Sequence, residues 1–235
     1  MEIYTEKNQT LEQRPSFRQH MTKTFGWMFI GLVVTFAIAY AMGLNEEFTL
    51  SLFANMPFLP IVIIVAELAV VIALSSRVGK MAPTTAKILY LAYAALTGIT
   101  FSILVVVYSA GTVAQAFLTS AVYFGCLAVI GLTTRRDLTS IGTICFGALL
   151  AFIIYQVLAL IFGWGMNTML YSMIGLLIFA GITAWDAQKI KKNYIQFENE
   201  PQKLESLSIY SALSLYLDFI NIFLYILRIF GSGKD

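Results

Sequence analysis

Apolar residues fill the chain in seven successive blocks, which polar or charged residues separate. Each block has about 18 to 24 residues, and an α-helix needs about 20 residues to cross a bilayer core about 30 Å thick. The pattern therefore predicts an all-α, polytopic membrane protein. The expected spans lie at residues 25–44, 57–75, 86–108, 113–133, 140–162, 169–188 and 208–230. The expected domains are a cytoplasmic N-terminal segment (1–22), a seven-helix transmembrane domain (23–231) and a C-terminal tail (232–235).

The amino-acid composition excludes several classes of function. Hydrophobic residues make up 59% of the 235 residues and charged ones 12%, a balance that a soluble domain of this length does not carry. The net charge is +2, and the basic residues do not form one patch, so nucleic acid is not an expected partner. The two cysteines, Cys126 and Cys145, lie within apolar blocks, and the single histidine is His20. We therefore expect neither a disulfide framework, nor a zinc site, nor a histidine-based triad.

The basic residues predict the orientation, because Lys and Arg near span ends are retained on the cytoplasmic side. They lie before the first block and after the second, fourth and sixth: Arg14, Arg18 and Lys23; Arg77, Lys80 and Lys87; Arg135 and Arg136; Lys189, Lys191, Lys192 and Lys203. The alternate connections contain no Lys or Arg. We expect a cytoplasmic N-terminus, and the charged segment 189–205 is expected to be a flexible connector.

Ionisable residues inside the predicted spans are the candidates for function, since each costs a few kcal/mol unless it pairs, faces the bundle interior or contacts water. They are Glu67, Asp186 and Asp218, with Arg228 near a span end. Glu67 is either part of an ion pathway or a protonated buried acid that bonds to the backbone or a serine.

Polar residues of the last span recur at alternating steps of three and four, which places them on one helix face. They are Ser211, Ser214, Asp218, Asn221, Tyr225 and Arg228. We expect this face to turn inward, where Ser211, Ser214, Asn221 and Tyr225 are candidates for lining a pore. The alternative is that the uncharged members only form hydrogen bonds between helices.

Asp186 and Asp218 are a candidate pair. The helices that carry them are antiparallel neighbours in the simplest topology, although counting along the helices places the two residues about 12 Å apart in depth. Two carboxylates that meet in a low dielectric do not both ionise freely, so they would share a proton and titrate in two steps. Such a pair suits a proton sensor, and its oxygens suit transient calcium binding. The alternative for Asp186 is an ion pair with Lys189 or Lys192.

Four segments resemble the Bax inhibitor-1 family in its bacterial inner-membrane branch. They are FGWM (25–28), LTTRRDL (132–138), GITAWDAQKI (181–190) and LSLYLDFIN (213–221), the last running on to LRIFG (227–231). The resemblance spans nearly the whole chain. It implies a bacterial inner-membrane protein of seven helices with the last helix central in the bundle.

The resemblance also implies a pH-sensitive calcium leak governed by two aspartates, which map onto Asp186 and Asp218. It implies a basic residue after the second span that latches to this pair; Arg77 and Lys80 both lie near that place, and Arg77 is favoured. Calcium ions, protons and the lipid bilayer are then the partners, with no enzyme activity and no resident cofactor.

Two alternative functions remain. One is a non-transporting regulator that binds other membrane proteins, with the aspartates serving only structure. The other is an intramembrane aspartyl protease, which is disfavoured because Leu215, Tyr216 and Leu217 precede Asp218 where such enzymes have glycines.

Overall fold

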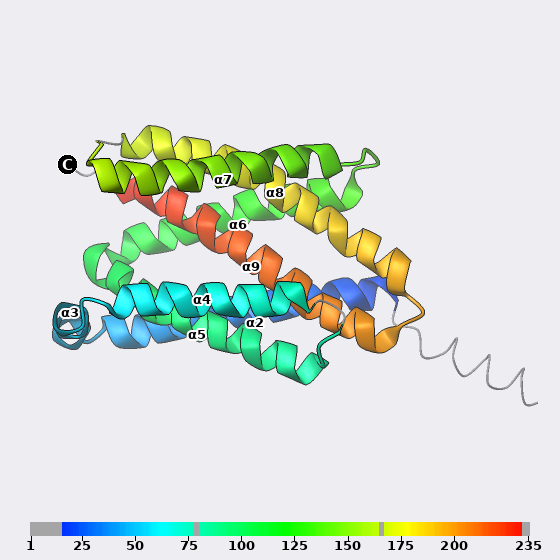
Figure 1. Ribbon diagram of the computed structural model, residues 1–235, viewed down its shortest axis with the longest axis horizontal. Coiled ribbons are helices and arrows are strands. Elements are labelled where there is room, and N and C mark those ends of the chain that lie inside the picture. Colours follow the sequence, from blue (N-terminus) through cyan, green and yellow to red (C-terminus); the bar gives the residue numbers. More distant parts are fainter. Residues whose placement is uncertain (1–15, 78–79, 165–166, 232–235) are drawn as a thin grey trace, which may run out of the picture. The chain divides into compact units, whose positions relative to one another are not determined.

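A computed structural model describes residues 16–77, 80–164 and 167–231. In these ranges the chain forms eight α-helices and no strand (Figure 1). The helices are α2 (Phe17–Gly43), α3 (Glu46–Asn55), α4 (Leu59–Ser76), α5 (Pro83–Val107), α6 (Ala110–Thr133), α7 (Thr139–Phe162), α8 (Thr168–Phe197) and α9 (Pro201–Gly231). All except α3 are long and apolar enough to cross a membrane. The prediction of an all-α protein with seven spans is confirmed.

The helix ends follow local sequence signals. Ser16 and Gln19 form a reciprocal capping box at the start of α2, with N···O distances of 2.9 and 3.2 Å. The helices α5 and α9 both begin with a proline, whose missing N–H costs nothing in the first turn. Gly163 ends α7 with a φ of 66°, a left-handed conformation that favours glycine.

One expectation about the connections is wrong, and one helix in a connection was not expected. Segment 189–205 is not a flexible connector: α8 continues to Phe197 and α9 begins at Pro201, so most of the segment is helical. The helix α3 was not expected, because its ten residues are too few to span a bilayer. Its start is nevertheless signalled by Asn45, whose side chain accepts a 3.0 Å hydrogen bond from the N–H of Phe48.

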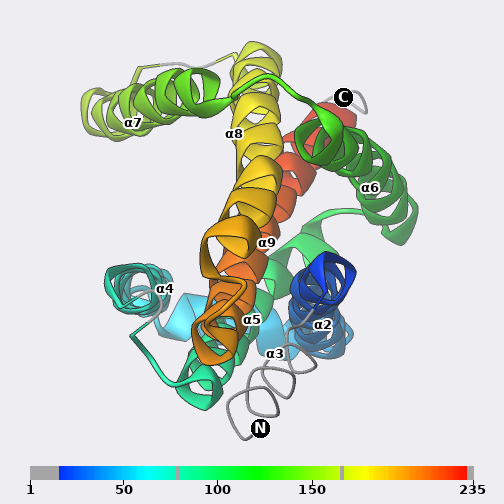
Figure 2. The same cartoon turned by 90° about the vertical axis from the view of Figure 1, so that its right-hand side faces the viewer.

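The chain divides into two compact units. The first contains the described residues up to Leu104 together with Ile190–Leu213, and the second contains Val105–Lys189 and the rest of α9 from Ser214. In the first unit α2 packs against α5 (Figure 2). The hydroxyl of Tyr90 on α5 donates to the carbonyl of Trp27 on α2 over 2.9 Å. In the second unit, aromatic residues of α6 pack on α9, as Phe124 does on Phe219.

The spans differ greatly in burial. In the most apolar window of α9, 61% of the residues are buried, against 6% in α7. Burial in the last span is not limited to its polar face, because Leu215 and Phe219 are buried as completely as Asp218. Burial on all sides is what a helix surrounded by other helices shows.

Candidate functional site

Close helix contacts in the second unit position the α8 segment that carries Asp186. Gly131 of α6 lies against the backbone of Ala184, and Gly142 of α7 lies under the ring of Trp185. A Cβ atom at either glycine would overlap its neighbour, so only glycine allows these approaches. Asp186 is therefore placed by tightly packed backbone on two sides.

Gln188 ties the same segment to the connection between α6 and α7. Its Nε2 donates to the carbonyl of Arg136 over 2.8 Å, and its Oε1 accepts from the N–H of Leu138 over 3.0 Å. Leu138 is the N-cap of α7 and supplies no side-chain cap of its own. The amide of Gln188 thus completes a helix start fifty residues away, a role that sequence reasoning missed because it took Gln188 only as a span end.

Asp186 forms an ion pair within its own helix. Its Oδ1 accepts a 2.8 Å hydrogen bond from Nζ of Lys189, and this Nζ lies 3.3 Å from the centroid of the Trp185 ring. The carboxylate is buried, whereas the Lys189 side chain is one-third exposed, at 33%. The alternative ion pair with Lys189 is therefore present in the structure.

Asp218 lies beside this pair. It is 3% exposed and interacts electrostatically with both Asp186 and Lys189. Thr183 of α8 is also close to Asp218. Within the described ranges, however, neither Oδ2 of Asp218 nor the Thr183 hydroxyl has a hydrogen-bond partner. The structure thus places Asp218 within electrostatic range of the ion pair of Asp186 and Lys189. Among the described residues, Oδ2 of Asp218 has no hydrogen bond although it is buried.

The other candidates on the polar face have separate surroundings. Ser211 is buried in the first unit, while Asn221 donates to the carbonyl of Leu217 in its own helix over 2.8 Å. Tyr225 is buried against Phe179. Ser214 is half-buried. Their role in lining a pore stays a prediction.

Arg228, near the end of α9, contributes to a cavity of about 770 Å³ in the second unit. Trp164, Thr168 and Tyr171 also line this cavity. The guanidinium carbon of Arg228 lies 5.7 Å from the centroid of the Tyr171 ring. The polar face therefore borders open space at its C-terminal end.

Glu67 and Arg77 belong to the first unit. Glu67 is half-buried and accepts a 2.9 Å hydrogen bond from the hydroxyl of Thr97, so its partner is a threonine. The exposed Arg77 follows the last turn of α4, and its carbonyl accepts from the N–H groups of Lys80 and Met81. The latch role of Arg77 stays a prediction.

The described residues of this site offer few ligands for a metal ion. In the described part of the chain, no group of three or more His, Cys, Asp or Glu side chains could hold a metal ion. Two carboxylates beside a lysine ammonium offer fewer than the six to eight oxygen ligands that calcium prefers. Transient calcium binding by Asp186 and Asp218 stays a prediction.

Known proteins resemble the chain over its full length. A sequence profile of the family described as "Inhibitor of apoptosis-promoting Bax1" matches residues 17–235. Inner membrane protein YbhL of Escherichia coli K12 is 36% identical over the whole of both chains. An uncharacterized protein of Deinococcus radiodurans is 36% identical, and the match covers all of this chain and 97% of the relative. An uncharacterized protein of Rickettsia prowazekii is 34% identical, and the match covers 98% of this chain and 96% of the relative. The chain is an integral membrane protein that belongs to the Bax inhibitor-1 family.

Proposed function

We propose that this protein is a pH-sensitive leak pathway for calcium, in which Asp186 and Asp218 form the proton sensor. The observation that carries the proposal is the pair itself: two buried aspartates from α8 and α9 lie within electrostatic range of each other, and Lys189 pairs with Asp186. A carboxylate in a membrane span is costly, and ionisable residues there usually serve a function, which makes the pair a candidate for function.

The charge of this cluster depends on a single proton. With Asp186 ionised and paired to Lys189, a protonated Asp218 leaves the cluster neutral, and an ionised Asp218 makes it negative by one charge. Buried carboxylates with few hydrogen bonds are sensitive to this difference, because little water is present to compensate it. A change of one charge inside a packed bundle can shift the balance between a closed and an open arrangement.

The remaining candidates belong to this proposal in supporting roles. Glu67, Ser211, Ser214, Asn221 and Tyr225 are proposed to line the ion pathway, and Arg77 is proposed to latch the closed form. The name of the E. coli relative and the pattern of basic loops support a location in the bacterial inner membrane with a cytoplasmic N-terminus.

The test is calcium flux into liposomes that contain the purified protein, measured with an enclosed calcium dye across about pH 5 to 8, where a coupled carboxylate pair can titrate. Asp186→Asn and Asp218→Asn keep the side-chain shape and remove the titrating group. We expect the wild-type flux to change with pH and the flux of either variant to lose most of that change.

Asp137→Asn is the matched control. Asp137 lies in the same unit, is exposed, and accepts hydrogen bonds from Thr139 that an amide oxygen can also accept. Its pH profile should equal that of the wild type. An unchanged profile in Asp218→Asn would contradict the sensor. Flux no greater than that of empty liposomes at every pH would contradict transport and favour the non-transporting regulator.

A further inference from the structure

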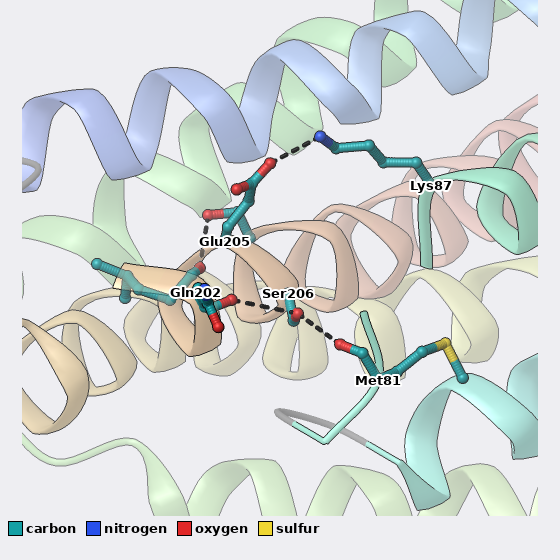
Figure 3. A network of polar contacts seen from close by, with 7 residues as sticks. Met81, Lys87, Gln202, Glu205 and Ser206 are labelled. Atoms are coloured by element: carbon teal, nitrogen blue, oxygen red, sulfur yellow. Dashed lines mark hydrogen bonds and ion pairs between the residues drawn. The ribbon is translucent and has the colours of Figure 1, made fainter. Parts of the chain in front are cut away.

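A second polar site lies in the first unit, where the start of α5 meets the start of α9 (Figure 3). It is a cavity of about 870 Å³, which we call the α5–α9 cavity. Residues 80–84 and 87 line one side, and residues 200–203, 205 and 206 line the other. Its volume falls in the range of about 300 to 1,000 Å³ that is usual for ligand pockets.

The lining of this cavity is positively charged. Lys80, Lys87 and Lys203 line it together with two glutamates, so the net charge is +1. Lys87 pairs with Glu205 over 2.7 Å, and Lys203 pairs with Glu200 over 3.5 Å. Lys80 is exposed and forms no ion pair in the part of the chain that the structure describes. The cavity therefore has one cation in excess.

Hydrogen bonds hold the two sides of the cavity together. The hydroxyl of Ser206 donates to the carbonyl of Met81 over 2.9 Å and lies 3.3 Å from the carbonyl of Gln202 (Figure 3). The bond between Ser206 and Met81 joins the start of α9 to the segment before α5. The lysines are consequently presented by a preformed frame instead of by separate loops.

Two helix starts add to the positive potential. The first backbone hydrogen bonds of α5 and α9 are donated by Ala86 and Leu204. The N–H groups of Thr84 and Gln202 precede them and belong to the free donors of a helix start. Both residues line the cavity. The positive ends of two helix dipoles thus reinforce the lysines, which favours an anion.

A divalent cation fits this cavity poorly. Glu200 and Glu205 are each engaged by a lysine, and the described residues contain no cluster of three or more metal-binding side chains. A cation would have to displace both ammonium groups. An anion with several oxygens can instead accept hydrogen bonds from the lysines and the backbone.

The surroundings of the cavity match the headgroup level of a membrane. Nζ of Lys87 lies 5.5 Å from the centroid of the Trp27 ring, and tryptophan prefers the boundary between lipid and water. The next residue on α5, Ile88, is 62% exposed and offers apolar surface for an acyl chain. Basic residues beside a span attract anionic lipids.

We propose that the α5–α9 cavity binds the phosphate group of an anionic phospholipid. Lys80 and Lys203 bind the phosphate oxygens, Lys87 stays paired with Glu205, and the acyl chains lie along the exposed side of α5. This site is independent of the aspartate pair and of calcium transport.

The experiment is a lipid titration of the detergent-solubilised full-length protein, followed by native mass spectrometry. The three probes are phosphatidylglycerol, phosphatidylcholine with the same acyl chains, and water-soluble glycerol 3-phosphate. We expect one phosphatidylglycerol to bind more tightly than phosphatidylcholine. Removing one lysine near a membrane surface should weaken binding about fivefold, so Lys80→Gln with Lys203→Gln should weaken it about thirtyfold.

The control replaces Lys191 and Arg135, which are exposed and do not line the cavity, by glutamine and should change the affinity less than about twofold. The charge-conserving pair Lys80→Arg and Lys203→Arg should retain binding even if the glutamine variant is poorly folded. Equal affinity for the two lipids, or equal losses in the cavity and control variants, would overturn the proposal. Equally tight, lysine-dependent binding of glycerol 3-phosphate would support the phosphate site but assign it to a soluble ligand.

Discussion

Two ion pairs of nearly equal length lie in very different surroundings. The pair of Asp186 and Lys189 measures 2.8 Å, and its carboxylate side chain is 10% exposed. The pair of Lys87 and Glu205 measures 2.7 Å, and its side chains are 30% and 36% exposed. Distance does not distinguish the two pairs, whereas access to water does.

Burial changes what each pair can do. An exposed pair contributes about 0 to 1 kcal/mol, because water and salt screen both charges. Loss of one partner from a buried pair costs about 3 to 5 kcal/mol, because the other charge is left without compensation. The more exposed pair suits a surface that exchanges ligands. The buried pair suits a site whose charge is tightly controlled.

The largest expected effect compares these pairs directly. Lys189→Met should lower the free energy of unfolding by about 3 kcal/mol. This value is at the lower end of the range for a buried pair, because Lys189 is partly exposed. Lys87→Met should lower it by about 0.5 kcal/mol. Both values can be measured by unfolding the protein with sodium dodecyl sulfate in mixed micelles and following the circular dichroism. Equal losses of unfolding free energy in the two variants would show that burial does not change the contribution of the ion pair to stability.

The next effect concerns the packing that holds the buried pair. Gly131→Ala places a methyl group against the backbone of Ala184, and this overpacking should lower the free energy of unfolding by about 2 kcal/mol. Gly125→Ala is the control in the same helix, because nothing lies within 4 Å of its Cβ position. Its free energy of unfolding should stay equal to that of the wild type or rise by about 0.5 to 1 kcal/mol, because alanine loses less backbone entropy in a helix than glycine does. A tolerant Gly131→Ala would mean that α6 and α8 can separate without cost.

The smallest effect concerns the hydrogen bonds beside the buried pair. Gln188→Met keeps the size of the side chain and removes both bonds to the connection between α6 and α7, which should cost about 1 kcal/mol. The local signature is hydrogen exchange at the amide of Leu138, which should become faster. Unchanged exchange at this amide would contradict the capping role of Gln188.

The sequence predicted the transmembrane helices well and the polar connections badly. All seven spans begin within about eight residues of the expected positions, because span length follows from hydrophobic runs. The helical segment 189–197 was not predicted, because it is charged. In the sequence, charged residues of a helix that extends beyond the membrane resemble those of a loop. The helix α3 was missed for its shortness, although Asn45 followed by Glu46 and Glu47 is a typical helix start.

The candidate site was predicted in part. Asp186 and Asp218 stood out because each is an ionisable residue in an apolar span, and the structure places them within electrostatic range of each other. The alternating polar face of the last span suggested one inward side, but α9 is buried on its apolar sides as well. Gln188 could not be singled out, since its partners lie fifty residues away in a turn without a recognisable pattern.

Hydrophobic runs, basic loops and the family segments were sufficient by themselves to establish a seven-span membrane protein of the Bax inhibitor-1 family. These properties are local, because each span must satisfy its own backbone hydrogen bonds within the bilayer. Only the tertiary structure decided that Asp218 lies near the pair of Asp186 and Lys189, that Oδ2 of Asp218 has no hydrogen bond among the described residues, and that three lysines surround one cavity. Those features depend on contacts between helices that are distant in sequence, and packing geometry, which no local pattern encodes, determines them.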